Sequence, residues 1–168
     1  MLTNLRVSRM LLVAEHPALG WGVSMANTKP IGVAYEDQNI IGADLIEATK
    51  VYASSQLGYT TDSYRTVTQT GNKASGVTIN APCGTITTAN AQMAPGAEVA
   101  FVVTNNQISS LDTVIINIAS GATATFAYLI AVVTVQDGSF TVNLTNQSNN
   151  AYTDTLKINF SILHVQPY

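Results

Sequence analysis

The sequence predicts an all-β protein: an antiparallel β-sandwich or jelly roll with a long irregular N-terminal arm. Two observations predict this fold class. Residues 65–168 contain alternating apolar runs separated by turn residues, whereas residues 1–64 contain no such alternation. A period of two places the apolar side chains on one face of a strand. The chain therefore divides into an arm over residues 1–64 and a β-sandwich domain over residues 65–168.

Eight segments of the second part are predicted to be strands. Five show clear alternation: Val99–Val103, Val114–Ile118, Phe126–Val132, Phe140–Leu144 and Leu156–Ile162. Three shorter candidates precede them: Arg65–Gln69, Val77–Asn80 and Thr85–Thr88. The predicted core includes Val99, Phe101, Ile116, Phe126, Tyr128, Phe140, Val142, Ile158 and Phe160.

One turn carries a specific expectation. Asp137-Gly138 separates two alternating runs by two residues. This dipeptide is typical of a type I′ hairpin turn, which needs positive φ at both positions. We therefore expect the runs on either side to form a hairpin.

The first part lacks regular elements. Gly20-Trp21-Gly22 and Lys29-Pro30 interrupt any long helix or strand. Asp44 and Glu47 have the spacing of a capping box, which predicts at most one short helix near residues 43–53. So long an irregular stretch inside a compact domain is uncommon, and it favours an extended arm that packs on neighbouring subunits.

Charge is scarce along the whole chain. Seven Lys and Arg and ten Asp and Glu make up 10% of 168 residues, against about 25% in ordinary soluble domains. Thr, Asn, Ser and Gln together supply 55 residues instead. A net charge of −3 argues against a nucleic-acid-binding surface. The single cysteine excludes an intrachain disulfide framework.

No membrane span or export signal is expected. The longest apolar runs fall far short of the roughly 20 residues of a spanning helix. Arg6 and Arg9 precede only five apolar residues, Met10–Ala14, fewer than the 7–15 or so of a signal peptide. We expect synthesis in the cytoplasm without a signal peptide. A surface with little charge repulsion suits a subunit of an assembly.

Candidate chemistry is weak at every position. Glu15-His16 with His164 could form an acid–base set, and Asp37, Asp44 and Glu47 could pair like glycosidase carboxylates. Cys83 has no cationic neighbour to activate its thiol, and Asn143, Asn146 and Asn159 match the glycosylation triplet. Structural roles are the commoner explanation for each of them. We expect no enzyme, cofactor or metal site.

Several runs of the second part resemble a segment that recurs in structural proteins of tailed bacteriophages. They are residues 67–80 (VTQTGNKASGVTIN), 83–87 (CGTIT), 96–105 (GAEVAFVVTN), 112–117 (DTVIIN) and 138–146 (GSFTVNLTN). The resemblance covers about residues 66–163 and carries no catalytic residue. In such families this kind of domain belongs to capsid decoration (cement) proteins or to head and tail fibres.

The resemblance implies a virion protein that binds the outer capsid surface and clamps neighbouring major capsid subunits. The alternative is a head or tail fibre or adhesin module that binds a host surface glycan. By analogy with cement proteins, a homo-oligomer is expected, most often a trimer, with neither nucleic acid nor membrane as partner. The irregular arm is the expected clamp, and its anchors are predicted to be Leu11, Leu12, Trp21 and Tyr35, because apolar and aromatic side chains anchor interfaces.

Overall fold

A computed structural model describes residues 50–165 of the chain. Residues 52–165 belong to one compact unit, Tyr52–Tyr168. A short 3-10 turn, η1 (Thr61–Ser63), precedes eight strands. The strands are β1 (Tyr64–Thr68), β2 (Val77–Thr78), β3 (Cys83–Thr87), β4 (Glu98–Thr104), β5 (Thr113–Ser120), β6 (Tyr128–Gln136), β7 (Ser139–Asn146) and β8 (Lys157–Leu163). Every segment that the alternation predicted overlaps one of them, and the all-β class is confirmed.

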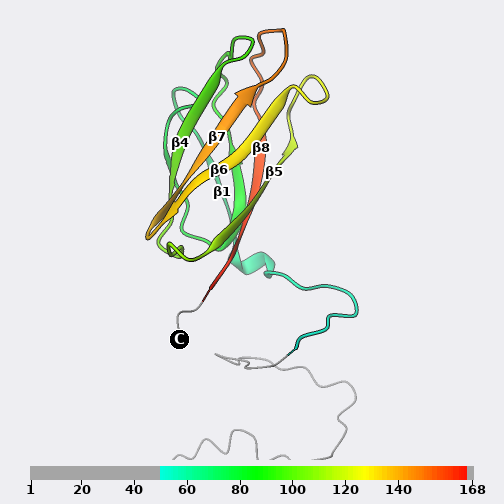
Figure 1. Ribbon diagram of the computed structural model, residues 1–168, viewed down its shortest axis with the longest axis vertical. Helices are drawn as coiled ribbons and strands as arrows, with labels where there is room; N and C mark the ends of the chain where they lie inside the picture. Colours follow the sequence, from blue (N-terminus) through cyan, green and yellow to red (C-terminus); the bar gives the residue numbers. More distant parts are fainter. Residues whose placement is uncertain (1–49, 166–168) are drawn as a thin grey trace, which may run out of the picture. The chain divides into compact units, whose positions relative to one another are not determined.

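The strands form two four-stranded sheets (Figure 1). The strand order is β1-β3-β8-β5 in the first sheet and β2-β4-β7-β6 in the second. From β1 to β6, successive strands alternate between the two sheets. The strand pairs are nested in the sequence. β3 pairs with β8, and β4 and β7, which both lie between β3 and β8 in the sequence, pair with each other.

The prediction of antiparallel pairing is wrong for two of the pairs. β1 runs parallel to β3, and β2 runs parallel to β4. A chain that crosses to the opposite sheet and returns resumes its first direction, so strands joined through the other sheet become parallel neighbours. Gly84 permits the close β1–β3 approach, because a Cβ there would collide with the Arg65 carbonyl oxygen.

One hydrophobic core is shared by both sheets. Phe140 of β7 and Phe160 of β8 meet across it, with ring centroids 5.6 Å apart and a tilt of 51°. Of the predicted core residues, six are buried: Phe101, Tyr128, Phe140, Val142, Ile158 and Phe160. Val99 and Ile116 are partly buried and pack against the core.

Phe126 is the error in the predicted core, because its side chain is 90% exposed. β6 begins two residues later, at Tyr128. The φ of Phe126 is +59°, in the left-handed region. This backbone conformation breaks the period-two alternation and turns the ring away from the core.

The predicted β6–β7 hairpin is confirmed, but its turn type is not. Gln136 pairs with Ser139, which leaves Asp137-Gly138 as a two-residue turn. Gly138 has a φ of +80°. Phe126 is the one non-glycine residue with positive φ in the described part of the chain, so Asp137 lacks the positive φ of a type I′ turn.

A neighbouring loop accounts for this turn geometry. The N–H of Gly138 donates to the Ile108 carbonyl at 3.0 Å, and the Gly138 carbonyl accepts from the N–H of Asn105 at 2.9 Å. The Asp137 carboxylate accepts from the N–H of Ser110 at 2.7 Å. These tertiary hydrogen bonds orient the turn, in addition to the twist of its own strands.

Most of the predicted arm lies outside the described residues. The predicted helix near 43–53 lies outside them as well, except for residues 50–53, which are not helical. No helix between residues 50 and 165 has the length and apolar character needed to cross a membrane.

The core predicts a large effect for Phe101→Ala. The ring is 2% exposed and belongs to the shared core. Its removal should lower the free energy of unfolding by about 3–5 kcal/mol. The matched control is Val102→Ala on the same strand, whose side chain is 46% exposed and which should cost less than about 1 kcal/mol. Equal losses for the two variants in urea unfolding would contradict the assigned facing of β4.

Candidate interaction surface

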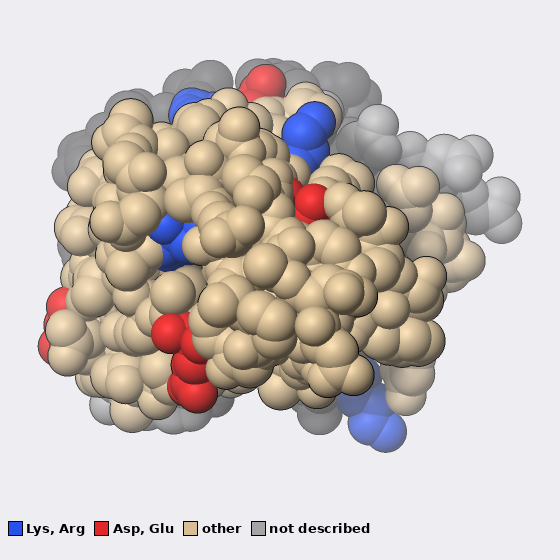
Figure 2. Space-filling model, turned by 90° about the horizontal axis from the view of Figure 1, so that it is seen from above, with Lys and Arg blue, Asp and Glu red and all other residues tan. Residues whose placement is uncertain are grey.

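Within the described residues, no segment covers the outer face of the β2-β4-β7-β6 sheet, and this face is nearly free of charge. The register places three outward rows across β4, β7 and β6: Glu98, Thr145 and Leu129; Ala100, Asn143 and Ala131; Val102, Thr141 and Thr134. The single carboxylate in these rows, that of Glu98, accepts a hydrogen bond from the Asn143 amide. Figure 2, which views the molecule from one end, also shows only a few Lys, Arg, Asp and Glu side chains among mainly uncharged residues.

Two tyrosines partly cover the outer face of the other sheet. The hydroxyl of Tyr59 donates to the Ile162 carbonyl. The hydroxyl of Tyr64 lies 2.5 Å from that of Thr85, which in turn donates to Asn159. The compact unit therefore includes tyrosines before residue 65, where the sequence had placed the start of the β-sandwich domain.

Cys83 begins β3 and is buried. Burial raises the pKa of its thiol, which reduces the reactive thiolate at neutral pH. The surroundings are those of a packing residue.

His164 pairs with a buried carboxylate. Its Nδ1 lies 3.0 Å from Asp112 Oδ2. The same carboxylate accepts from the N–H of Ser109 at 2.9 Å and from the N–H of Val165 at 2.8 Å. Burial disfavours the charged form of Asp112, but these hydrogen bonds outweigh it and lower its pKa to about 2.

The Asp112–His164 pair lies beside a shallow hollow of about 340 Å³. Among the described residues, no hydroxyl or thiol is hydrogen-bonded to the imidazole, as a nucleophile activated by this base would be. The carboxylate instead fastens the chain just after β8 to the loop between β4 and β5. The arrangement therefore has a structural role, in which Asp112 connects two segments of the chain.

The asparagine of each glycosylation triplet, Asn143, Asn146 and Asn159, forms a side-chain hydrogen bond within the fold. Asn146 has no exposed surface. Its amide donates to the carbonyls of Met93, Ala94 and Asn150, and its oxygen accepts from Ser148. A buried amide with these partners has no room for a sugar, so its role is to hold the loops around β7.

Sequence reasoning missed Lys73, a buried cation. Its ammonium donates to the Thr88 hydroxyl at 3.2 Å, to the Ala89 carbonyl at 2.7 Å and to the Asp154 carbonyl. Burial lowers the pKa of Lys73, while the charge of Asp154 opposes this shift. The sequence feature that could have pointed to Lys73 is the scarcity of cations around it, since Lys157 is the only later Lys or Arg.

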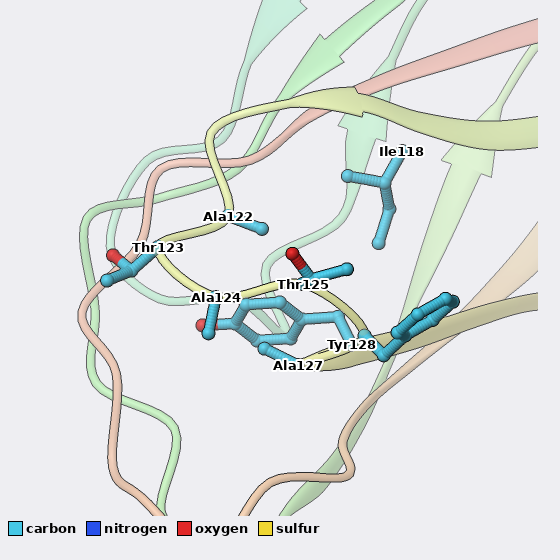
Figure 3. A pocket seen from close by; sticks show the side chains of 8 residues that line it. Ile118, Ala122, Thr123, Ala124, Thr125, Ala127 and Tyr128 are labelled. Atoms are coloured by element: carbon cyan, nitrogen blue, oxygen red, sulfur yellow. The ribbon is translucent and has the colours of Figure 1, made fainter.

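The loop between β5 and β6 carries the exposed ring of Phe126. A hollow of about 330 Å³ lies at this loop and is lined by Ile118 and residues 122–128 (Figure 3). A non-glycine residue in the left-handed region costs roughly 1–2 kcal/mol. The loop thus presents an apolar ring to solvent in a strained conformation.

The remaining sequence candidates lie outside the described residues. They are the predicted anchors Leu11, Leu12, Trp21 and Tyr35, the pair Glu15-His16, and the acidic residues Asp37, Asp44 and Glu47. Between residues 50 and 165, no group of three or more His, Cys, Asp or Glu side chains is placed to hold a metal ion.

Comparisons with protein-family models, characterised proteins and solved structures found no match. The function of the chain has therefore to be inferred from its own residues and their arrangement.

The buried ammonium predicts a large difference between two lysines. Lys73→Met would remove a donor from three oxygens, of which the Ala89 carbonyl keeps the N–H of Ala91 and the Thr88 hydroxyl keeps the N–H of Leu156. The Asp154 carbonyl loses its donor, so the free energy of unfolding should fall by about 1–3 kcal/mol. The matched control is Lys157→Met, because Lys157 is exposed on β8 and should cost less than about 1 kcal/mol. Urea unfolding of both variants measures the difference, and equal small losses would contradict a structural role for Lys73.

Asp112 predicts a specific loss of stability in acid. Its folded pKa of about 2 lies below the ordinary value of 3.8, so the unfolded chain takes up the proton first as the pH falls. The stabilisation by the carboxylate is complete above about pH 4 and is lost toward pH 2. Unfolding measured across this range should show a component that Asp112→Asn lacks.

His164→Ala is the control for this measurement. It removes the imidazole from Asp112 but keeps the hydrogen bonds from the N–H groups of Ser109 and Val165. A smaller loss of unfolding free energy in acid should therefore persist in this variant. If the free energy of unfolding falls with pH in parallel for the parent and Asp112→Asn, the Asp112 carboxylate is not the source of the loss in acid.

Proposed function

We propose that this chain is a virion structural protein of a tailed bacteriophage. It binds the outer surface of the capsid as a decoration protein and clamps neighbouring major capsid subunits. The observation that carries the proposal is the open, nearly uncharged outer face of the β2-β4-β7-β6 sheet. Phage-like motifs along residues 66–163 support the same function.

An uncharged face favours contact with other protein surfaces. Burying a charge is costly unless it is paired, whereas hydroxyl and amide groups lose less on leaving water. Rows of Thr, Asn and Ala can thus pack on a neighbouring subunit at a small desolvation cost. Many such contacts on one particle add up through multivalency.

The proposal includes the fold type, which is a β-sandwich of the jelly-roll type. The nested pairs β3–β8 and β4–β7, with β5 and β6 between them in the sequence, follow the winding of a jelly roll. β1 and β2 then extend the two sheets at the opposite side. The arm over residues 1–64 supplies the clamp, and Leu11, Leu12, Trp21 and Tyr35 are its anchors. The functional unit is a trimer on the capsid surface.

One observation favours the alternative, a fibre or adhesin module that binds a host glycan. The exposed Phe126 ring and Thr125 belong to the same hollow, and an aromatic face beside a hydroxyl suits a sugar ring. A glycan-binding screen of the parent chain and Phe126→Ala tests this function. Binding that requires Phe126 would favour the adhesin over the decoration protein.

The clamp predicts that the arm is needed for decoration. A chain that starts at Tyr52 retains the whole compact unit and should keep its β-type circular dichroism spectrum and cooperative melting. It should fail to decorate capsids that lack the native protein, as seen by electron microscopy, while the full chain decorates them.

Two further results bear on this prediction. A full-length variant with alanine at the four anchors should fold and bind weakly. Decoration by the shortened chain at full affinity would assign binding to the sheet face and not to the arm. If the full chain leaves such capsids bare, the proposed function is wrong.

A further inference from the structure

We propose that a second copy of this chain docks along the β5–β6 edge, defined here as strands Thr113–Ser120 and Tyr128–Gln136. The inference deepens the proposed function and rests on it in treating the chain as a subunit of an assembly. It assigns the self-contact to one side of the β-domain. Three properties of this side support it: open strand edges, an incompletely covered core and the absence of charge.

Among the strands of residues 50–165, β5 and β6 are the outer strands of their sheets, and they lie on the same side of the domain (Figure 1). They have eight and nine residues, whereas the opposite outer strands, β1 and β2, have five and two. An outer strand leaves a row of N–H and C=O groups unpaired, and natural proteins protect such edges by shortness, charge or proline. The β5–β6 edge is long and contains no charged residue and no proline.

Register shifts do not remove this open edge. β6 is shifted against β7 between Val132 and Thr134, and β5 is shifted against β8 between Ile118 and Ser120. Regular pairing extends over Tyr128–Val132 of β6 and over Thr113–Ile118 of β5. These segments can each receive another strand or another apolar surface.

The core is incompletely covered at this side. The inward residues of β7, Phe140, Val142 and Leu144, have no exposed surface. Tyr128, at the start of β6, is buried. The other inward residues of the edge are only half-buried: Val114, Ile116, Ile118, Ile130, Val132 and Val135. A partner along this edge would complete their burial, as in obligate interfaces that resemble a core cut in half.

Apolar side chains also extend around the outside of the edge. Ile115 is 61% exposed, and Leu129 and Val133 are each 54% exposed. Phe126, at the loop that joins the two strands, continues the apolar surface. We call these half-buried and exposed apolar groups of β5 and β6 the apolar band of the edge.

A second copy is the occupant that this band fits. A partner that is recognised through charge would find none here, whereas two uncharged bands approach each other without repulsion. A copy also brings open strands of the same length. β6 is about 30 Å long at roughly 3.3 Å per residue. The two sheets lie about 10 Å apart, so the edge that β5 and β6 form together, side chains included, has an area on the order of 600 Å². That is close to the roughly 800 Å² per partner of a standard interface.

The test is the oligomeric state of the purified full chain without capsids, by sedimentation equilibrium. Leu129→Lys and Ile115→Lys place a charge on the β5–β6 edge, and each should weaken self-association at least about 100-fold. The matched control is Val102→Lys, an exposed apolar position on β4, two strands away from the edge. It should leave the oligomer unchanged, with all variants compared by melting temperature.

Hydrogen exchange of the unmodified chain gives a second readout that does not depend on folding of the variants. Amides of β5 and β6 should gain protection as concentration rises, and those of β1 should not. A chain that is monomeric at about 100 μM, or an oligomer that only Val102→Lys dissociates, overturns the inference. Capsid decoration by a monomeric parent chain would overturn the inference alone, whereas an edge-dependent oligomer that binds no capsid would overturn the proposed function alone.

Discussion

The contact between Phe140 and Phe160 joins the two sheets at the centre of the domain. Their strands, β7 and β8, each lie between two neighbours and provide the most deeply buried side chains. Every other strand from β3 onward pairs directly with one of these two. Burial therefore decreases from this contact toward the outer strands, where most inward side chains are only partly covered.

Scarcity of charge changes how the loops are held. Between residues 50 and 165 the one ion pair is that of His164 with Asp112, and neutral groups inside the loops provide most of the other side-chain contacts. Asn105 and Asn146 are fully buried, and the amide of Asn105 donates to the Ala81 carbonyl while that of Asn146 donates to carbonyls of two loops. Lys73 uses its ammonium in the same way, as a donor to three oxygens. A buried amide needs no counter-charge, so this construction keeps polar loops ordered while the surface stays neutral.

Alternation predicted the strands because one face of each strand must meet the core, whichever neighbour it pairs with. It could not predict the parallel direction of β1 and β2, because the same pattern serves both directions. Phe126 is apolar and continues the period-two pattern of β6 in the sequence. Its φ of +59°, which the sequence does not reveal, excludes it from the strand. The Asp137-Gly138 turn depends on hydrogen bonds from residues more than 25 positions earlier in the chain. Predicted anchors of the arm lie outside the described residues, whereas the open sheet face and the β5–β6 edge emerge only from the register.

The two sides of the domain differ in a way that bears on assembly. On the β1–β2 side the outer strands have only five and two residues, which leaves little edge for further pairing. On the β5–β6 side the strands are long, apolar and uncharged, a combination that in a free monomer invites uncontrolled aggregation. Selection against aggregation would place charges on such a side, as it does on ordinary soluble domains. The absence of charges supports the proposed self-contact, because copies arranged around a symmetry axis would cover these strands without leaving a new edge open.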